Sequence, residues 1–361
     1  MENITQKNID TAVKSPPVGD LGDCILVIGG GIAGMEASKQ LAILNYNVTL
    51  IEKEPKLGGH VKNWDKLFPN KRPSQEIISH LENGLNHQNI TVRTDTDIVS
   101  LQKNGNTFEA TLSTGEKLNA DAVLITTGYS LFNAHRKEEY GYGIYHNVIT
   151  SAELEHKFAH GEVKTAEGKI PKRVGIIHCV GSRDEKCGNV YCSRVCCVTG
   201  VKQAIEIKEM YPETEVFNFY MDLRMFARGF EQLYLEAQQK HRVRFVRGRL
   251  SEASENQEHG IIIKVDDTLV GRPMKMTVDL LVLMVGFESI KSNNKLFDEI
   301  GLQEDEDHFL AIRDCHLDGN RTNIPGIFVA GTCTGPKSIN ETLSNANSAT
   351  LKINEELRMK N

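Results

Sequence analysis

The sequence predicts an α/β chain with two dinucleotide-binding units, the second inserted into the first. Three observations predict this: a glycine-rich βαβ fingerprint near the N-terminus, a strand-and-glycine motif near the C-terminus, and a second strand ending in glycine between them. A chain of 361 residues has room for about two domains. We expect a flexible arm over 1–22, a first unit over 23–169 plus 289–361, and an inserted unit over 170–288.

Composition and charge exclude several classes of protein. The net charge of -6 gives no reason to expect a nucleic-acid or anionic-membrane partner. The polar N-terminus lacks the apolar core of a signal peptide, and no apolar run approaches the ~20 residues of a membrane span. We therefore expect a cytoplasmic protein, in which disulfides do not persist. The eight cysteines then indicate metal or redox use.

The N-terminal fingerprint predicts a nucleotide site. It consists, in order, of a strand at 24–28, the glycines Gly29, Gly31 and Gly34, a helix at 35–45, and a strand at 48–51 that ends at Glu52. Gly29 permits the tight turn, Gly31 lets the backbone approach a pyrophosphate, and Gly34 allows close helix–strand packing. The phosphates would lie at the helix N-terminus, with Glu52 accepting hydrogen bonds from ribose hydroxyls.

Three further motifs identify the expected nucleotide as FAD. Gly58-Gly59 after the ribose acid is typical of two-domain flavoproteins, and residues 121–128 resemble the strand that closes the same half. Residues 324–331 match the second FAD motif, although Thr332 replaces the usual aspartate with an uncharged hydroxyl. The residues expected to bind the cofactor are Gly29, Gly31, Ile32, Ala33, Gly34, Glu52, Lys53, Gly58, Gly59, His60, Ile98, Thr127, Gly128, Gly331, Thr332, Lys337, Ser338 and Ile339.

A helix is expected to begin just after Lys337. Ser338 is a suitable N-cap, and Glu341 three residues later would complete a capping box. In this type of fold the helix points at the flavin pyrimidine, so its positive end and Lys337 would stabilise negative charge on the reduced ring. Lys337 is therefore the predicted flavin-tuning residue; the alternative is a solvated surface lysine.

The inserted unit repeats the pattern with one part missing. Residues 279–287 echo 121–129, and the first strand is expected at 173–178. A glycine-rich phosphate loop should follow in an NAD(P)H-binding unit, but 179–184 contains one glycine only. The unit is predicted to have lost its nucleotide, with cysteines in its place.

Five cysteines occupy this segment: Cys179, Cys187, Cys192, Cys196 and Cys197. A structural zinc site usually shows Cys-x2-Cys pairs, which are absent here. A vicinal disulfide would be strained. A four-thiolate iron–sulfur cluster is the favoured interpretation, although the spacing does not match ferredoxins and does not select four of the five.

The cysteines outside this segment have a simpler interpretation. Cys24, Cys315 and Cys333 are isolated in the sequence, and we expect small buried hydrophobic residues there.

The segment from His178 to Lys202 resembles the heterodisulfide reductase A family, whose hallmark is Cys-Val-Gly-Ser-Arg followed by Tyr-Cys-Ser-Arg-x-Cys-Cys. The match continues through 222–234 and 335–337. The resemblance implies FAD in a thioredoxin-reductase-like fold and a 4Fe-4S cluster in the inserted unit. It implies the cluster ligands Cys179, Cys192, Cys196 and Cys197, with Cys187 left over.

The departures from the methanogen proteins narrow the expectation. Those versions carry an additional cluster domain, ferredoxin modules and cysteines near a Phe-Pro pair, whereas 67–74 contains no cysteine. The short form resembles the flavin-binding component of sulfur-oxidising heterodisulfide-reductase-like complexes. This implies an electron-transfer subunit with FAD and a 4Fe-4S cluster, in a homodimer that assembles with iron–sulfur subunits of the B and C type.

Three alternatives stay open. The first is the flavin subunit of a quinone-interacting oxidoreductase of sulfate reducers. The second is a free-standing NAD(P)H-dependent flavin oxidoreductase, and the third is a scaffold without catalysis.

Arginines near the cysteines allow two interpretations. Arg183, Arg194, Arg224 and Arg228 could raise the cluster potential or dock an acidic partner, or they could pair with nearby acids. Phe226 at helical spacing from Phe230 predicts a core side chain.

Overall fold

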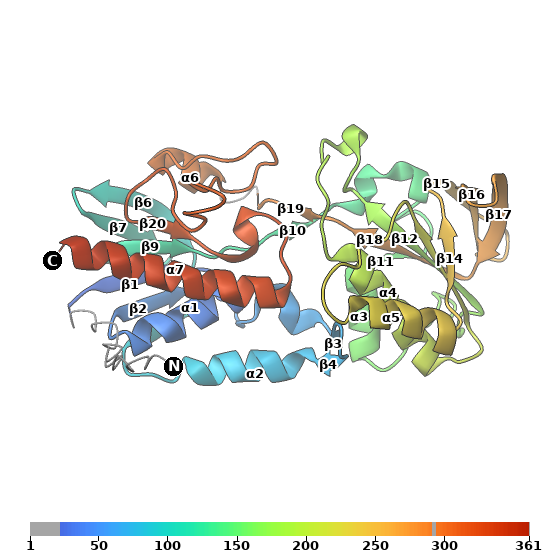
Figure 1. The fold of residues 1–361 in the computed structure, drawn as a ribbon, viewed down its shortest axis with the longest axis horizontal. Helices are drawn as coiled ribbons and strands as arrows, with labels where there is room; N and C mark the ends of the chain where they lie inside the picture. The colour runs from blue at the N-terminus through green and yellow to red at the C-terminus, as the bar shows by residue number, and fades with distance from the viewer. Residues whose placement is uncertain (1–21, 291–293, 361) are drawn as a thin grey trace, which may run out of the picture.

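The computed structural model describes residues 22–290 and 294–360. The predicted arm at 1–22 therefore lies outside the described residues except for Gly22. The described chain forms two lobes, with the first and last thirds of the sequence in one lobe and the middle third in the other (Figure 1).

A parallel five-stranded sheet forms the centre of the first lobe. Its strands in spatial order are β20 (Ile327–Val329), β9 (Ala122–Ile125), β1 (Cys24–Ile28), β2 (Asn47–Ile51) and β5 (Ile90–Arg93). Alternate residues of β1 enter different cores: Ile25 and Val27 join one cluster, and Leu26 and Ile28 join the other. The strand is apolar throughout because both faces of the sheet are covered.

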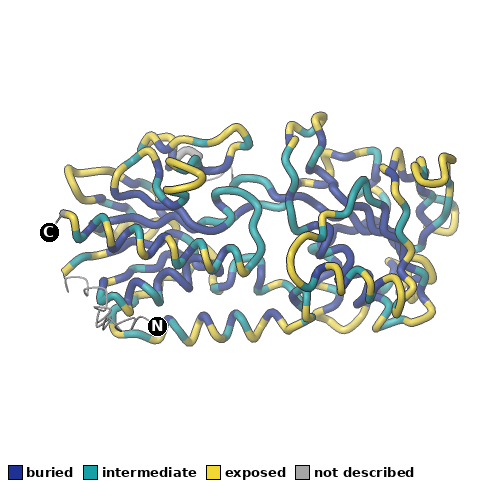
Figure 2. Tube along the Cα trace, viewed as in Figure 1, coloured by how far each residue is buried: buried dark blue, intermediate teal, exposed yellow. Residues whose placement is uncertain are grey.

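Helices cover one face of this sheet and a small antiparallel sheet covers the other. The helices are α1 (Ile32–Ile43), α2 (Ser74–Gly84) and α7 (Ile339–Lys360). The covering strands are β6 (Ile98–Asn104), β7 (Thr107–Leu112) and β8 (Lys117–Ala120), and α6 (Asn294–Ile300) packs in the same core. In Figure 2 the central strands are the most deeply buried part of this lobe, and the outer faces of the helices are exposed. Helix α1 begins at Ile32, three residues before the predicted start, directly after the glycines.

The second lobe repeats this plan with a second parallel sheet. Its strands in order are β11 (Val148–Thr150), β18 (Leu280–Val285), β12 (Arg173–Val180), β13 (Glu215–Tyr220) and β14 (Arg244–Arg247). Helices α3 (Ser151–Ala159), α4 (Cys196–Met210) and α5 (Phe230–Leu235) lie on one face, and the antiparallel strands β15 (Leu250–Glu255), β16 (Ile261–Asp267) and β17 (Arg272–Val278) on the other. Because β11 belongs to this sheet and α3 packs on one face of it, we propose that the second unit begins near residue 148 rather than 170.

The two lobes are joined by strands and by a hairpin. The antiparallel pair β10 (Ser130–Leu131) and β19 (Phe287–Glu288) crosses between them (Figure 1). The hairpin of β3 (Lys66–Leu67) and β4 (Arg72–Pro73) reaches from the first lobe to α5, where the ring of Phe68 packs edge-on against Phe230 at 5.5 Å.

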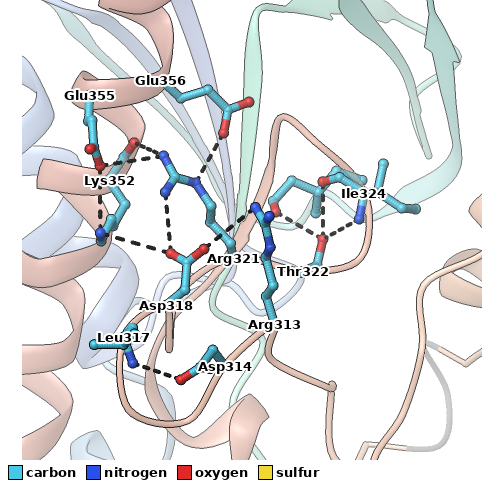
Figure 3. A network of polar contacts seen from close by, with 11 residues as sticks. Arg313, Asp314, Leu317, Asp318, Arg321, Thr322, Ile324, Lys352, Glu355 and Glu356 are labelled. Atoms are coloured by element: carbon cyan, nitrogen blue, oxygen red, sulfur yellow. Dashed lines mark hydrogen bonds and ion pairs between the residues drawn. The ribbon is translucent and has the colours of Figure 1, made fainter.

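A network around Arg321 anchors the segment that leads into β20 (Figure 3). Its guanidinium contacts Asp318 at 3.3 Å, and Glu356 on α7 at 3.2 Å. It also donates to the Lys352 carbonyl at 3.4 Å. These contacts connect the segment before the glycine motif at 324–331 to α7. The position of the motif relative to the helix is therefore fixed.

Candidate functional site

The N-terminal glycines form a tight junction between β1 and α1. Gly29 has φ +108°, and a Cβ there would lie 2.5 Å from the Thr126 carbonyl oxygen. A Cβ at Gly34 would lie 1.9 Å from the Gly29 carbonyl oxygen. Both positions therefore require glycine, one for its backbone conformation and one for close packing.

Glu52 braces this junction from the end of β2. One carboxylate oxygen accepts from the Gly30 N–H at 2.7 Å, and the other accepts from the Glu54 N–H at 2.8 Å. The side chain is buried, so these two hydrogen bonds satisfy a carboxylate that little water reaches. The predicted contact of Glu52 with a ribose is thus supported by a fixed position at the cavity wall.

A cavity of about 760 Å³ extends from these glycines toward the second lobe. Every residue predicted to bind the cofactor lines it, except Gly34, Ile98 and Gly331. A Cβ at Gly31 would meet no described protein atom within 4 Å, so the bare backbone faces open space. The cavity therefore fits a dinucleotide laid against the glycine loop.

The three residues that do not line the cavity have structural positions. Gly34 packs against Gly29, and a Cβ at Gly331 would lie 2.9 Å from the Ala33 side chain. Ile98, the first residue of β6, is buried in the core between the first sheet and the small antiparallel sheet. Gly34 and Gly331 pack against Gly29 and Ala33, which line the cavity, and so support its wall. The side chain of Ile98 belongs to the core and not to this wall.

The predicted helix start is confirmed at α7. Glu341 accepts from the Ser338 N–H at 2.8 Å, and the Ser338 hydroxyl accepts from the Glu341 N–H at 3.3 Å, which completes the capping box. Lys337 lines the cavity and donates to the Thr334 hydroxyl at 2.7 Å. Burial lowers the pKa of Lys337, so this lysine is part of the cavity wall and not a solvated surface residue.

The cysteine segment faces the same cavity from the second lobe. Cys196 and Cys197 are the first two residues of α4, and Cys196 lines the cavity together with Val195 and Thr199. The thiols of Cys179 and Cys196 are hydrogen-bonded to each other, as are those of Cys196 and Cys197. Among the described residues no side chain caps α4, so its first N–H groups can stabilise negative charge on the thiols.

These thiols ionise unequally. The hydrogen bond from Cys196 lowers the pKa of Cys197 to about 4 and that of Cys179 to about 7. The same neighbours, together with burial, keep the pKa of Cys196 well above its ordinary value. At neutral pH Cys197 is thus a thiolate and Cys179 is partly ionised, and the thiolate is the form that binds metal.

The remaining cysteines differ in their surroundings. Cys187 packs against the core on the other face of the sheet, and its carbonyl accepts from Arg136. Cys192 is half-buried in the loop before α4. Cys333 is buried as predicted, but the prediction was wrong for Cys24 and Cys315, which are exposed. Cys24 is the first residue of β1 and Cys315 lies in a turn, and both positions are at the surface, so neither side chain packs in a core.

The loop after β12 is filled by protein side chains. Gly181 has φ +71°, and a Cβ there would lie 2.1 Å from the ring of Phe132. Arg183 forms a bidentate ion pair with Asp222, at 2.6 and 3.0 Å, across the same loop. The backbone that would have to approach a pyrophosphate in an NAD(P)H site is therefore covered.

The arginines near the cysteines are mostly paired. Arg183 and Arg224 contact Asp222, and Arg194 pairs with Glu341 of the first lobe. The ion-pair interpretation thus holds for three of the four, although Glu341 was not foreseen as a partner. Phe226 is 67% exposed, so the prediction of a core side chain was wrong. It lies on an irregular segment before α5, so the helical spacing from Phe230 does not apply there.

A buried charge cluster, missed by sequence reasoning, forms the far wall of the cavity. Lys202 of α4 is 1% exposed and its ammonium contacts Glu155 at 2.6 Å and Glu206 at 2.9 Å. Gln203 donates to Glu155 at 2.6 Å. Glu155, Lys202 and Gln203 line the cavity. In the sequence, Lys202 and Glu206 have the i,i+4 spacing of a common surface pair, so only the tertiary structure reveals their burial.

The cluster holds two carboxylates for one ammonium group, with consequences for pH. Burial raises the pKa of Glu206 to about 7. The negative charge of Glu155 also raises this pKa, whereas the positive charges of Lys202 and Lys66 lower it. The folded protein therefore holds this proton more tightly than the unfolded chain does. Stability from this site is fully present below about pH 4.5 and is lost as pH rises toward 7.

We expect Glu206→Gln to flatten this pH dependence. The glutamine reproduces the protonated carboxyl, so the decrease of up to about 3 kcal/mol in the free energy of unfolding between pH 4.5 and 7 should largely disappear. Urea unfolding of both proteins at several pH values measures it. Parallel pH profiles for the wild type and the variant would contradict the assignment.

The fold and the site define a two-domain flavoprotein oxidoreductase. The chain belongs to the pyridine nucleotide-disulphide oxidoreductase family, whose model matches residues 2–149 and 197–350. As a member of this family it is an FAD-dependent oxidoreductase. The resemblance to heterodisulfide reductase A proteins that residues 178–202 carry is confirmed by the curated relatives, to which the chain is similar.

Several curated relatives share most of this chain. It is 32% identical to the iron-sulfur A component of the CoB--CoM heterodisulfide reductase of Methanocaldococcus jannaschii, over 90% of this chain and 63% of the relative. It is 30% identical to the A component of the H(2):CoB-CoM heterodisulfide,ferredoxin reductase of Methanothermobacter thermautotrophicus, over 91% of this chain and 63% of the relative. The chain thus spans less than two thirds of these relatives.

Solved structures confirm the fold class. The thioredoxin reductase of T. acidophilum is similar with a TM-score of 0.65 and 18% identity, covering 92% of this chain and 97% of that one. The thioredoxin reductase of Lactococcus lactis has a TM-score of 0.63 and 17% identity, covering 93% and 99%. Across residues 22–290 and 294–360, none of the helices combines the length and apolar character needed to cross a membrane.

Proposed function

We propose that this protein is an electron-transfer subunit that holds FAD and a 4Fe-4S cluster and exchanges electrons between them. One observation carries the proposal: the glycine loop of the first lobe and Cys196 of the second line the same cavity. An FAD with its pyrophosphate on the glycines and a cluster at the start of α4 would therefore share this cavity. Bound FAD supplies two-electron and one-electron chemistry, and the cluster supplies one-electron chemistry.

The residues of the chain would bind, orient and tune these groups. Gly29 and Gly31 leave room for the pyrophosphate, and Glu52 is fixed beside the ribose position. Lys337 and the start of α7 present positive charge to the flavin end of the cavity. For the cluster we propose Cys179, Cys192, Cys196 and Cys197, supported by the thiols grouped at the start of α4 and by the separate position of Cys187.

The filled loop after β12 favours this proposal over an NAD(P)H-dependent enzyme. Phe132 covers Gly181, and Arg183 with Asp222 closes the place where the pyrophosphate of a pyridine nucleotide would lie. A reductant would then deliver electrons through a protein partner and not as hydride from a bound nucleotide.

The cellular setting is also part of the proposal. The relatives are named as components of CoB-CoM heterodisulfide reductases, one of them also as a ferredoxin reductase. By analogy we propose a cytoplasmic complex that acts on sulfur compounds. In this complex two copies of the chain would form a homodimer, which would assemble with iron–sulfur subunits of the B and C type. Eight free thiols are consistent with a reducing compartment.

Purification without oxygen tests the proposal. We expect a brown protein that contains FAD, iron and acid-labile sulfide, and whose flavin is not bleached by NADH or NADPH. Rapid bleaching by either nucleotide would favour the free-standing flavin oxidoreductase. A colourless protein would favour the scaffold.

We expect Lys337→Met to lower the midpoint potential of the bound flavin. Removing a partly buried positive charge takes about 1–2 kcal/mol from the stabilisation of the reduced ring, which corresponds to about 20–40 mV for two electrons. Spectroscopic redox titration measures it. Lys117→Met is the control, because Lys117 lies on the surface paired with Glu109; an equal shift in both variants would contradict the role of Lys337.

A further inference from the structure

Arg194 links the two halves of the proposed site. It stands two residues from both Cys192 and Cys196, yet its side chain reaches the first lobe. One guanidinium nitrogen donates to the Pro336 carbonyl at 3.1 Å, and another contacts Glu341 at 2.6 Å. These two residues flank Lys337 and Ser338, which line the flavin end of the cavity.

The local structure directs Arg194 toward this partner. Its backbone has φ +59°, an uncommon conformation for a residue other than glycine. Its N–H donates to the Cys192 sulfur at 3.3 Å, so the turn and the thiol are held together. The ring of Phe226 lies 5.9 Å from the guanidinium, which explains an exposed aromatic residue above this loop. The backbone conformation and the two contacts thus set the direction in which the side chain crosses to the first lobe.

Glu341 serves both sides of the link. One of its oxygens accepts from the Ser338 N–H and hydroxyl, at 2.8 and 2.9 Å, and caps α7. The other accepts from Arg194. Hydrogen bonds between charged groups are shorter and stronger than neutral ones. The same carboxylate therefore fixes the start of the flavin-facing helix and the cysteine loop relative to each other.

We propose that Arg194 is a positioning residue that holds the cysteine segment at a fixed distance from the flavin end of the cavity. This inference rests on the proposed function. The step that it would serve is the passage of one electron between the two groups: a reduced flavin would give one electron to an oxidised cluster, or a reduced cluster would give one to an oxidised flavin, with no bond formed or broken. The neighbouring Arg183 differs, because its partner Asp222 belongs to its own lobe.

The link itself can be tested in the cofactor-free protein by hydrogen exchange. In Arg194→Ala we expect amides in 191–195 and 336–341 to exchange about tenfold faster, because a charge-assisted link between the lobes is lost. Glu341→Gln should do the same and keep the helix cap, since glutamine also serves at this capping-box position. Arg194→Lys should restore part of the protection. Arg244→Ala, a surface ion-pair variant at the far edge of the second sheet, should change neither segment.

Pulsed EPR on the loaded protein tests the consequence. We expect one narrow flavin-to-cluster distance in the wild type and in Arg244→Ala, and a broadened distribution in Arg194→Ala and Glu341→Gln, with FAD and iron contents unchanged. A wild type without iron would refute the proposed function and this role with it. If both groups are present and the variants keep the narrow distance or the slow exchange, this inference alone is overturned.

Discussion

The Cys196→Ala, Cys197→Ala double variant is expected to lose its iron and to keep its FAD. Both thiols stand at the first turn of α4, where the hydrogen bond between them lowers the pKa of Cys197 to about 4. Outer-shell substitutions at metal sites already cost about 10- to 100-fold in affinity, so removal of two direct ligands should leave less than about a tenth of the wild-type iron. The glycine loop that would hold FAD lies in the other lobe and is unchanged.

The matched control is Cys187→Ala. Cys187 belongs to the same five-cysteine segment, but it packs on the opposite face of the second sheet. Its removal should leave iron, sulfide and flavin at wild-type levels. Iron and sulfide assays, with flavin absorbance and circular dichroism as a check on folding, decide the matter. Full iron in the double variant, or lost iron in Cys187→Ala, would show that the ligand assignment is wrong.

The sequence predicted those parts of the site that depend on local constraints. Gly29 and Gly34 are required by a backbone conformation and a close contact, so their spacing, together with the flanking strands and helix and the acid at Glu52, predicts the βαβ unit. The capping box at Ser338 is equally local, because both partners lie within four residues. A helix start or a glycine turn is specified by neighbours in sequence, and a single sequence contains that information.

The missed features all depend on contacts between distant segments. Arg194 and Glu341 are 147 residues apart, and nothing in the sequence selects that partner over the nearer acids. Lys202 meets Glu155 across 47 residues in a place that only the packing of α3 on α4 makes dry. Phe226 was misjudged for the same reason, since its contact is an arginine from another loop.

The buried charge cluster gives the largest expected change in stability, in Lys202→Met. The variant leaves Glu155 and Glu206 buried without their ammonium partner, and breaking a buried ion pair in this way costs about 3–5 kcal/mol in the free energy of unfolding. Lys71→Met is the control: Lys71 also bridges two glutamates, at 2.6 and 3.1 Å, but it is 22% exposed. Solvent screens that cluster, so its loss should cost about 1 kcal/mol or less.

The pH dependence distinguishes loss of charge pairing from loss of packing. Without Lys202 the two buried carboxylates lose their ammonium partner, so their charged forms are penalised in the folded variant and its stability must fall as pH rises. The deficit relative to the wild type should be smallest near pH 5 and largest above pH 7. Adding Glu155→Gln to Lys202→Met should recover stability above pH 7, because one uncompensated charge is removed. A deficit that is constant from pH 5 to 8 and insensitive to Glu155→Gln would mean that Lys202 acts through packing alone.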